Sequence, residues 1–280
     1  RCGNRLSGGS FEILDRSFQI VSNHGNTERE ISLHGGEVGF DKRIWCATPR
    51  IVGDEAMLTL DLLSRDGDQG FPGNLRVRVT YTLTRDNALK IGYEAQTDQP
   101  TFVNLTNHTY FNLKGEGNGD VLGHEVRIDA DAITEVDADL VPTGELLPVR
   151  NSPLDLRESV KIGDRIDADH PQLRHGGGFD HNFALNKREG ELALAAEVFE
   201  PESGRVMEVH TTEPGVQFYT GNSLDESLVG KSGHRYGPRA GLCLETQHFP
   251  DAPRHEQFPS IVLMPGDTYR STTLYRFRAE

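Results

Sequence analysis

The sequence lacks a long hydrophobic run, paired cysteines and clusters of basic residues. Its apolar stretches are all shorter than the ~20 residues that a membrane-spanning helix needs, so we expect no membrane span. The three cysteines, Cys2, Cys46 and Cys243, lie far apart in the chain and indicate neither a disulfide framework nor a CxxC metal site. This cysteine usage predicts a reducing compartment, the cytoplasm.

Acidic residues outnumber basic residues in this sequence. The chain has 43 acidic and 29 basic residues and a formal net charge of -14. Such a surface repels nucleic acid and acidic lipid headgroups, so we expect neither as a partner. A neutral or cationic small molecule is the expected partner, and the sequence leaves open whether the protein is a monomer or a homodimer.

Helical periodicity is nearly absent, whereas a period of two is common. Apolar residues alternate with polar ones from Leu75 to Leu83 and again from Leu89 to Ala95, which predicts an antiparallel hairpin. The best helical candidate is one short piece, Leu154 to Val160. Similar short apolar runs, each bounded by turn residues, occur at Phe11 to Leu14, Met57 to Leu63, Glu125 to Ile128, Leu192 to Phe199, Val206 to Val209, Gly241 to Leu244 and Thr272 to Phe277.

Many short strands without a linker between them indicate an all-β fold with less than about a tenth of its residues helical, against a usual third. We expect residues 1–280 to form a single domain, a large antiparallel β-sandwich. Periodicity alone does not separate a sandwich from a barrel.

Polar and aromatic residues gather in several short segments typical of a sugar-binding pocket. Residues 103–113 place His108 among asparagines, threonines and aromatic rings, and residues 241–251 lead an apolar strand into Glu245. Amides and hydroxyls pair with sugar hydroxyls, while rings cover the apolar face of a sugar. Taken singly, either residue could be structural: a histidine satisfied at a strand end, or a carboxylate in an ion pair. Three further segments of this kind are residues 33–36, 178–183 and 216–222.

These segments, in this order, resemble the aldose 1-epimerase (galactose mutarotase) family. The motifs shared with the family are an Asn-Arg pair near the start, then LHGG, NHxYFNL, GFDHNF, VQFYTGN and LETQxFPDAP, and the resemblance runs from Asn4 to the strand near Phe277. It implies the galactose mutarotase-like supersandwich, and it implies that N-terminal strands of the family are missing from this chain. What precedes Arg1, including any targeting segment, is not visible in the sequence.

The resemblance also implies roles for individual residues. The histidine of NHxYFNL, His108, corresponds to the general acid, and the glutamate of LETQ, Glu245, to the general base. The substrate-binding positions of the family fall on Arg5, Asn4, His34, Asp180 and Gln217. No cofactor and no metal are implied, and the expected substrate is a free monosaccharide such as glucose, galactose or a pentose.

The implied reaction suits these residues. Anomers exchange when a base removes the proton of the C1 hydroxyl while an acid protonates the ring oxygen, which opens the ring to an aldehyde. We expect the site residues to converge on one open cleft. We also expect His108 and Glu245 to face each other across a sugar-sized gap without direct contact, because direct contact would favour a structural pair.

Three alternatives are less well supported. A metal site could use His175 and His181 near Asp180, but these residues lack the spacing of a helical metal motif. A hexose-6-phosphate 1-epimerase would need several cations, and the motifs offer mainly Arg5. A non-catalytic sugar-binding domain would be expected to lack His108 or Glu245, and both are present.

Overall fold

The computed structural model describes residues 1–25 and 29–280, which are almost entirely β-structure. About 45% of the residues are in strands and 6% in helices, and the sheets are antiparallel, so the predicted all-β fold is confirmed. The chain divides into two compact units, each built from two segments. The first unit contains Arg1–Thr106 and Gln247–Leu274, and the second contains Asn107–Thr246 and Tyr275–Glu280.

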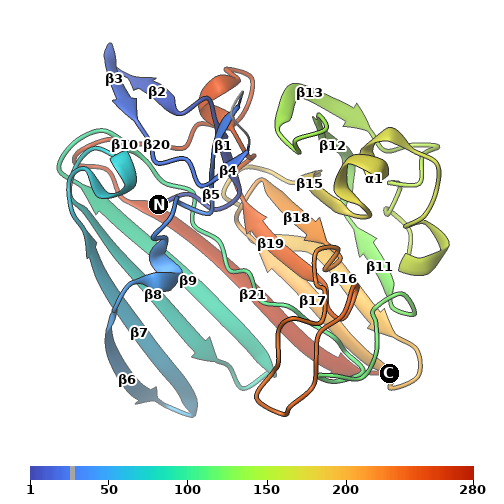
Figure 1. Cartoon of the computed structure of the whole chain (residues 1–280). Helices are drawn as coiled ribbons and strands as arrows, with labels where there is room; N and C mark the ends of the chain where they lie inside the picture. Colours follow the sequence, from blue (N-terminus) through green and yellow to red (C-terminus); the bar gives the residue numbers. More distant parts are fainter. Residues whose placement is uncertain (26–28) are drawn as a thin grey trace. The chain divides into compact units, whose positions relative to one another are not determined.

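The first unit is organised around long antiparallel strands in the order β21-β9-β8-β7-β6 (Figure 1). Its smaller sheets are β1-β5-β4, β2-β3 and β10-β20. The strands are β1 (Arg5–Ser7), β2 (Ser10–Ile13), β3 (Arg16–Gln19), β4 (His24–Gly25), β5 (Glu30–Leu33), β6 (Cys46–Val52), β7 (Glu55–Ser64), β8 (Leu75–Leu83), β9 (Ala88–Thr97), β10 (Thr101–Phe102), β20 (Val262–Leu263) and the first part of β21 (Tyr269–Ala279). The 3₁₀ turns are η1 (Phe40–Lys42), η2 (Asp68–Gly70) and η4 (Ala252–Arg254).

The predicted hairpin is present as β8 and β9. The two strands pair from Leu75 opposite Thr97 to Leu83 opposite Leu89. Val77 is buried while Arg78 is exposed, as the alternation requires. The core of this unit includes Phe11, whose ring centroid lies 4.5 Å from that of Phe102.

Hydrogen bonds to one side chain join the two chain segments of the first unit, near the start of each segment. Asp251, from the later segment, accepts hydrogen bonds from the backbone N–H of Ser7 at 2.9 Å and from its hydroxyl at 2.6 Å. Asp251 is 2% exposed, and these donors satisfy its buried carboxylate.

The second unit contains two sets of antiparallel strands. The first is β13-β12-β15-β18-β19, and the second is β14-β11-β16-β17 with the last part of β21 (Figure 1). The fully buried Tyr275 of β21 donates a hydrogen bond to the carbonyl of Leu244 in β19 at 2.9 Å, so the two sets are in contact within this unit. The elements are β11 (Glu125–Ile128), β12 (Ala130–Val136), β13 (Pro142–Pro148), β14 (Val160–Lys161), η3 (Ile162–Asp164), α1 (Pro171–Gly176), β15 (Asp180–Leu185), β16 (Ala193–Glu200), β17 (Arg205–Thr211), β18 (Gly215–Tyr219) and β19 (Cys243–Gln247).

The helix predicted over Leu154 to Val160 is wrong, because residues 154–159 form turns, bends and irregular backbone and Val160 begins β14. Leu154 and Leu156 are both buried although they are only two residues apart, which a helix would not allow on one face. The α-helix among the described residues is α1, Pro171–Gly176, where His170 is the N-cap residue and Pro171 occupies the first turn. Six residues are too few to give a periodic signal.

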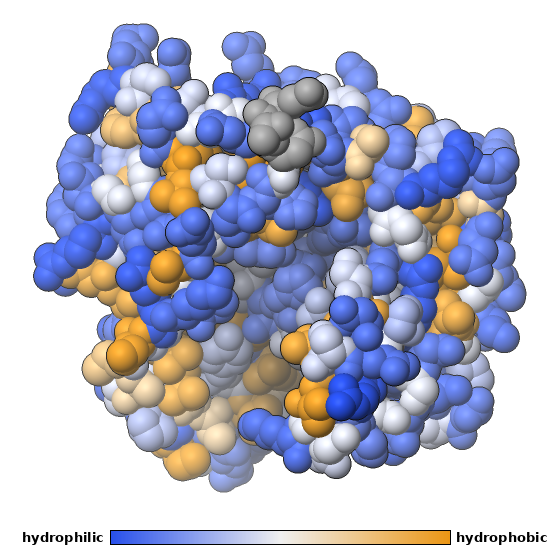
Figure 2. All heavy atoms as spheres, in the orientation of Figure 1, coloured by the Kyte–Doolittle hydropathy of each residue, from blue (hydrophilic) through white to orange (hydrophobic). Residues whose placement is uncertain are grey.

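The surface is polar over much of the face seen in Figure 2, with apolar residues in scattered patches. Exposed large apolar side chains include Ile44, Ile51 and Leu83 in the first unit. Within the described residues, no helix has the length and apolar character needed to cross a membrane.

Two buried histidines of the second unit predict that the protein loses stability in acid. Burial lowers the pKa of both His124 and His181 to about 4, from an ordinary 6.5. The unfolded chain therefore takes up these protons first as the pH falls, so stability present above pH 6.5 is lost between about pH 6.5 and 4. Each histidine contributes at most about 3 kcal/mol to this loss.

Urea unfolding measured between pH 7 and 5 tests this prediction. His124→Gln should reduce the dependence of the free energy of unfolding on pH, because the titrating group is gone. The exposed His24 in β4 offers a matched control, since His24→Gln should leave that slope as in the parent. Equal slopes for the parent and His124→Gln would contradict the proposed origin of the effect.

Candidate active site

The loop that carries His108 is fixed by hydrogen bonds on both sides of the histidine. The Asn107 side-chain oxygen accepts bonds from the backbone N–H of Thr109 at 3.1 Å and from its hydroxyl at 2.5 Å. Phe111 and Leu242 exchange two backbone hydrogen bonds at 2.7 and 2.8 Å. This short bridge holds the His108 loop beside the residues that lead into β19, the strand that carries Glu245.

Glu245 is a buried carboxylate on β19. Its side chain is 3% exposed, whereas that of His108 is 33% exposed. All five residues of β19 are buried, which follows from its near-continuous apolar approach through Leu242, Cys243 and Leu244. A carboxylate in such a position is costly unless it is paired or used in chemistry.

His108 and Glu245 are in direct contact in the structure. The His108 Nε2 atom lies 3.4 Å from the Glu245 Oε1 atom. The expectation of a sugar-sized gap between them is therefore wrong. The physical reason is that the ring oxygen and the C1 hydroxyl of a pyranose are bonded to the same carbon, so the acid and base that serve them need not be far apart.

The contact is longer than the 2.7–2.9 Å typical of a charge-assisted hydrogen bond, and catalytic hydrogen bonds are often long before substrate binds. A structural ion pair would give a similar distance, so substitution is needed to separate the two roles. Burial lowers the pKa of His108, and the charge of Asp180 partly opposes this.

Asp180 and Gln217 form a second polar pair in this unit. The Gln217 amide donates a 2.6 Å hydrogen bond to the Asp180 Oδ1 atom. Asp180 begins β15 and Gln217 lies in β18, and these strands pair with Asp180 opposite Tyr219 and Asn182 opposite Gln217. The antiparallel register thus brings together two residues that are 37 positions apart in the chain.

His181 has a structural role that excludes the metal site considered above. Its Nδ1 atom accepts a hydrogen bond from the Asp180 backbone N–H at 3.1 Å, and its Nε2 atom lies 3.1 Å from the carbonyl of Gln172. The Nδ1 atom of His175 lies 3.1 Å from the carbonyl of Val136. Both ring nitrogens of His181 are thus used by the backbone, which leaves neither for a metal ion.

Three aromatic rings meet at the general-acid candidate. Tyr110 stacks on His108 with ring centroids 5.1 Å apart and an interplanar angle of 20°. Tyr219 packs edge-on against both rings, with centroids 6.2 Å from each. Tyr219 also accepts a hydrogen bond at its hydroxyl from the Ser223 backbone N–H at 2.9 Å, so the group of rings is held in place.

The remaining predicted residues, Asn4, Arg5 and His34, come together in the first unit. The backbone N–H of Asn4 donates to the His34 Nδ1 atom at 3.1 Å, and the His34 N–H donates to the Asn4 carbonyl at 3.0 Å. The Asn4 side-chain oxygen accepts from the Arg5 N–H at 2.9 Å. Pairing of β1 with β5, with Arg5 opposite Leu33, produces this arrangement. Asn4 and His34 both have a positive φ, 55° and 51°, which non-glycine residues adopt rarely.

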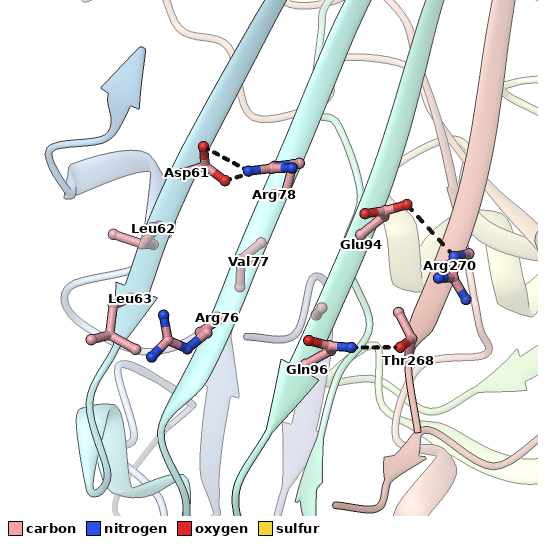
Figure 3. Close-up of a pocket in the computed structure, with 11 residues that line it drawn as sticks. Asp61, Leu62, Leu63, Arg76, Val77, Arg78, Glu94, Gln96, Thr268 and Arg270 are labelled. Carbon is pink, nitrogen blue, oxygen red and sulfur yellow. Dashed lines mark hydrogen bonds and ion pairs between the residues drawn. The ribbon is translucent and has the colours of Figure 1, made fainter. Parts of the chain in front are cut away.

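A groove of about 510 Å³ lies elsewhere in the first unit, on the polar face of β7, β8, β9 and β21 (Figure 3). Its charged residues are largely paired with one another: Arg78 with Asp61 at 2.8 Å, and Arg270 with Glu94 at 3.6 Å. None of the predicted site residues lines it.

Tyr110 and Tyr219 were not predicted as site residues, although both lie in motifs shared with the family. Their position inside NHxYFNL and VQFYTGN was the available signal. Asn222 lies in the second of these motifs as well, whereas Arg239 lies in none of them.

Comparison with known proteins places the chain in a family. The model of the aldose 1-epimerase family matches residues 1–276. Galactose mutarotase of Sus scrofa is 46% identical over 277 residues, which are 99% of this chain and 77% of that protein. Aldose 1-epimerase of Escherichia coli (strain K12) is 38% identical over 283 residues, covering 100% of this chain and 79% of that protein.

Solved structures agree with the sequence comparison. The GalM/aldose epimerase homologue from C. elegans superimposes with a TM-score of 0.87 at 28% identity, covering 100% of this chain and 81% of that one. Galactose 1-epimerase from Lactobacillus acidophilus NCFM superimposes with a TM-score of 0.85 at 27% identity, covering 100% of this chain and 78% of that one. The predicted mutarotase-like fold is thereby confirmed.

The matched fold and sequence define an isomerase that acts on a monosaccharide. The chain belongs to the aldose 1-epimerase family, and its activity is the interconversion of the α and β anomers of an aldose. The activity predicted from the sequence, interconversion of the anomers of an aldose, is confirmed.

Proposed function

We propose that His108 is the general acid and Glu245 the general base of the anomer exchange. The observation that carries this proposal is that the histidine of NHxYFNL and the glutamate of LETQ meet, with the His108 Nε2 and Glu245 Oε1 atoms 3.4 Å apart. One imidazole nitrogen and one carboxylate oxygen at this spacing suit two oxygens bonded to a single carbon. General acid and base groups of this kind act through proton transfer in the transition state.

The proposed reaction needs no net transfer of protons or electrons. Glu245 takes the proton of the C1 hydroxyl while His108 gives a proton to the ring oxygen. The C1–ring oxygen bond breaks, C1 becomes an aldehyde, and rotation about the C1–C2 bond presents its other face. On closure His108 recovers its proton from the former ring oxygen, and Glu245 returns its proton to the oxygen on C1, which gives the other anomer.

Sugar recognition is proposed for Arg5, Asn4, His34, Asp180 and Gln217. Asp180 and Gln217 support each other through their 2.6 Å hydrogen bond, and a carboxylate held in this way is suited to accept a hydrogen bond from a sugar hydroxyl. Arg239 is engaged by Asn222 and by a backbone carbonyl, so it is not arranged as a phosphate ligand. We therefore propose an unphosphorylated hexose or pentose as the substrate.

Three broader proposals accompany this assignment. The cysteine usage favours the cytoplasm, and the charge favours neither nucleic acid nor membrane as a partner. Residues 1–280 are proposed to form one domain, which a single cooperative unfolding transition would support. Separate transitions for the two units would contradict that proposal.

Polarimetry on freshly dissolved α-glucose, α-galactose, xylose and arabinose tests the substrate assignment. We expect mutarotation well above the buffer rate for at least one of these free sugars, and a slower rate with glucose 6-phosphate. Faster turnover of the phosphate ester than of every free sugar would reverse the proposal.

Asp180→Ala is expected to raise KM by about tenfold to a hundredfold, because a hydrogen bond to a charged group contributes about 1.5–3 kcal/mol. If the contact is equally strong in the ground and transition states, kcat should change much less. Initial rates over a range of sugar concentrations give both constants. An unchanged KM would remove Asp180 from the binding residues.

A further inference from the structure

The turn between α1 and β15 ends at the proposed sugar ligand Asp180, and its backbone is unusual. Gly177, directly after the helix, has φ 60°, and Gly178 has φ 136°. The last carbonyl groups of a helix have no partners within the helix and need donors from elsewhere. In this turn the carbonyls of Gly176, Gly177 and Phe179 all accept hydrogen bonds from side chains.

Asn222 supplies two of these hydrogen bonds. Its side-chain amide donates to the carbonyl of Gly176 at 2.7 Å and to that of Phe179 at 3.0 Å. Its side-chain oxygen accepts from the fully buried Thr220 hydroxyl at 2.6 Å, which orients the amide toward the turn. One side chain thus joins the end of α1 to the residue immediately before Asp180.

Arg239 supplies the third hydrogen bond and holds Asn222. One guanidinium nitrogen donates to the Gly177 carbonyl at 2.9 Å, and the other donates to the Asn222 side-chain oxygen. The Arg239 backbone N–H also donates to the Gly221 carbonyl at 3.1 Å. Gly178 has a φ of 136°, which residues with a side chain rarely adopt, and a Cβ there would also meet the Arg239 guanidinium, so the turn favours glycine at this position.

We propose that Asn222 and Arg239 are positioning residues that fix Asp180 for sugar recognition. This inference rests on the proposed role of Asp180 and identifies what holds that carboxylate in place. Asp180 is attached to the clamped turn at Phe179, to His181 through its backbone N–H and to Gln217 through its carboxylate. Loss of the side-chain hydrogen bonds to the turn removes the support of Asp180 at Phe179. The hydrogen bonds that hold the His108 loop and β19 are separate from this turn and remain.

The proposal predicts a change in KM without a matching change in kcat. Asn222→Ala should raise KM about tenfold, while kcat changes less than about threefold, because sugar binding is weakened and proton transfer is not. Arg239→Lys keeps the positive charge but has no planar guanidinium to bond the Gly177 carbonyl and the Asn222 side-chain oxygen together. It should therefore also raise KM, but by less than Asn222→Ala does. It also serves as the gentler variant if Asn222→Ala folds poorly.

A double-mutant cycle separates positioning from a general structural effect. If Asn222 acts through Asp180, then Asn222→Ala should raise KM little or not at all in the Asp180→Ala background. Equal rises in both backgrounds would show an effect independent of Asp180 and overturn the inference. Arg76→Ala, at an exposed arginine in the groove of Figure 3, is the matched control for Arg239 and should leave both constants unchanged.

The outcomes also separate this inference from the proposed role of Asp180. If Asp180→Ala raises KM but neither Asn222→Ala nor Arg239→Lys does, the positioning role is wrong and the binding role stands. If Asp180→Ala leaves KM unchanged, the binding role fails, and the positioning role fails with it.

Discussion

Glu245→Gln is expected to lower kcat by about 10²- to 10⁴-fold, the usual contribution of general acid–base assistance. The amide keeps the shape and hydrogen-bonding capacity of the carboxylate but cannot accept the proton of the C1 hydroxyl. The contacts of Asp180 and Gln217 with sugar should remain, so KM should change only modestly. With chemistry this slow, KM of the variant approaches the dissociation constant of the sugar.

Polarimetric or NMR measurement of anomer exchange gives both constants, and Glu200 offers a matched control. Glu200 is buried like Glu245 and lies in the same unit, but its carboxylate accepts hydrogen bonds from the backbone N–H groups of Glu202 and Ser203 at 3.0 and 2.7 Å. Glu200→Gln should therefore affect stability more than kcat. Near-normal activity in Glu245→Gln would mean that the contact with His108 is structural and that another residue is the base.

His108→Gln is expected to lower kcat by a similar factor, about 10²- to 10⁴-fold, because the donor to the ring oxygen is lost. Since the two groups act on one transition state, the double variant with Glu245→Gln should be little slower than the worse single variant. Additive losses would mean that the two residues do not act in the same step.

The pH dependence provides a second measure of the role of His108. Burial lowers its pKa below 6.5, so the imidazolium form disappears as the pH rises through a value below 6.5. The part of kcat/KM that depends on the imidazolium should fall over the same range, and His108→Gln should lack this inflection. His175→Gln changes a partly buried histidine of the same unit and should keep it. An inflection that persists in His108→Gln belongs to another group.

The strands were predictable because successive side chains of a strand point to opposite faces of the sheet, so apolar and polar residues alternate along the sequence. Val77 and Arg78 illustrate this, since one faces the interior and the next faces solvent. The α-helix was not predictable in the same way, because α1 has only six residues and is defined by its N-cap and its terminal glycines. The apolar residues Leu154 and Leu156 are buried by a turn, and this local apolar content caused the incorrect helix prediction.

The sequence motifs named the candidate site residues, but they did not give the geometry in which those residues meet. Asp180 and Gln217 were named from their motifs, but their hydrogen bond depends on the register of β15 and β18, which the sequence does not state. The contact between His108 and Glu245 was missed because the prediction placed a sugar-sized gap between two groups that serve the ring oxygen and the C1 hydroxyl, although these two oxygens are bonded to one carbon. Arg239 was missed because it lies outside the motifs, and its partners, the Gly177 carbonyl and the side chains of Thr220 and Asn222, meet it only in the folded chain.

The division of each unit into two chain segments affects how the protein can fold during synthesis. The first unit includes residues 247–274 and the second includes residues 275–280, so both need residues that follow residue 246. Asp251, the partner of Ser7, leaves the ribosome 244 residues after it. At about 5–20 residues per second, the N-terminal strands wait on the order of ten seconds or more for their partners. Neither unit can therefore be completed until residues 247–280 have been synthesised, whereas a local hairpin such as β8 with β9 can form as soon as its own two strands are available.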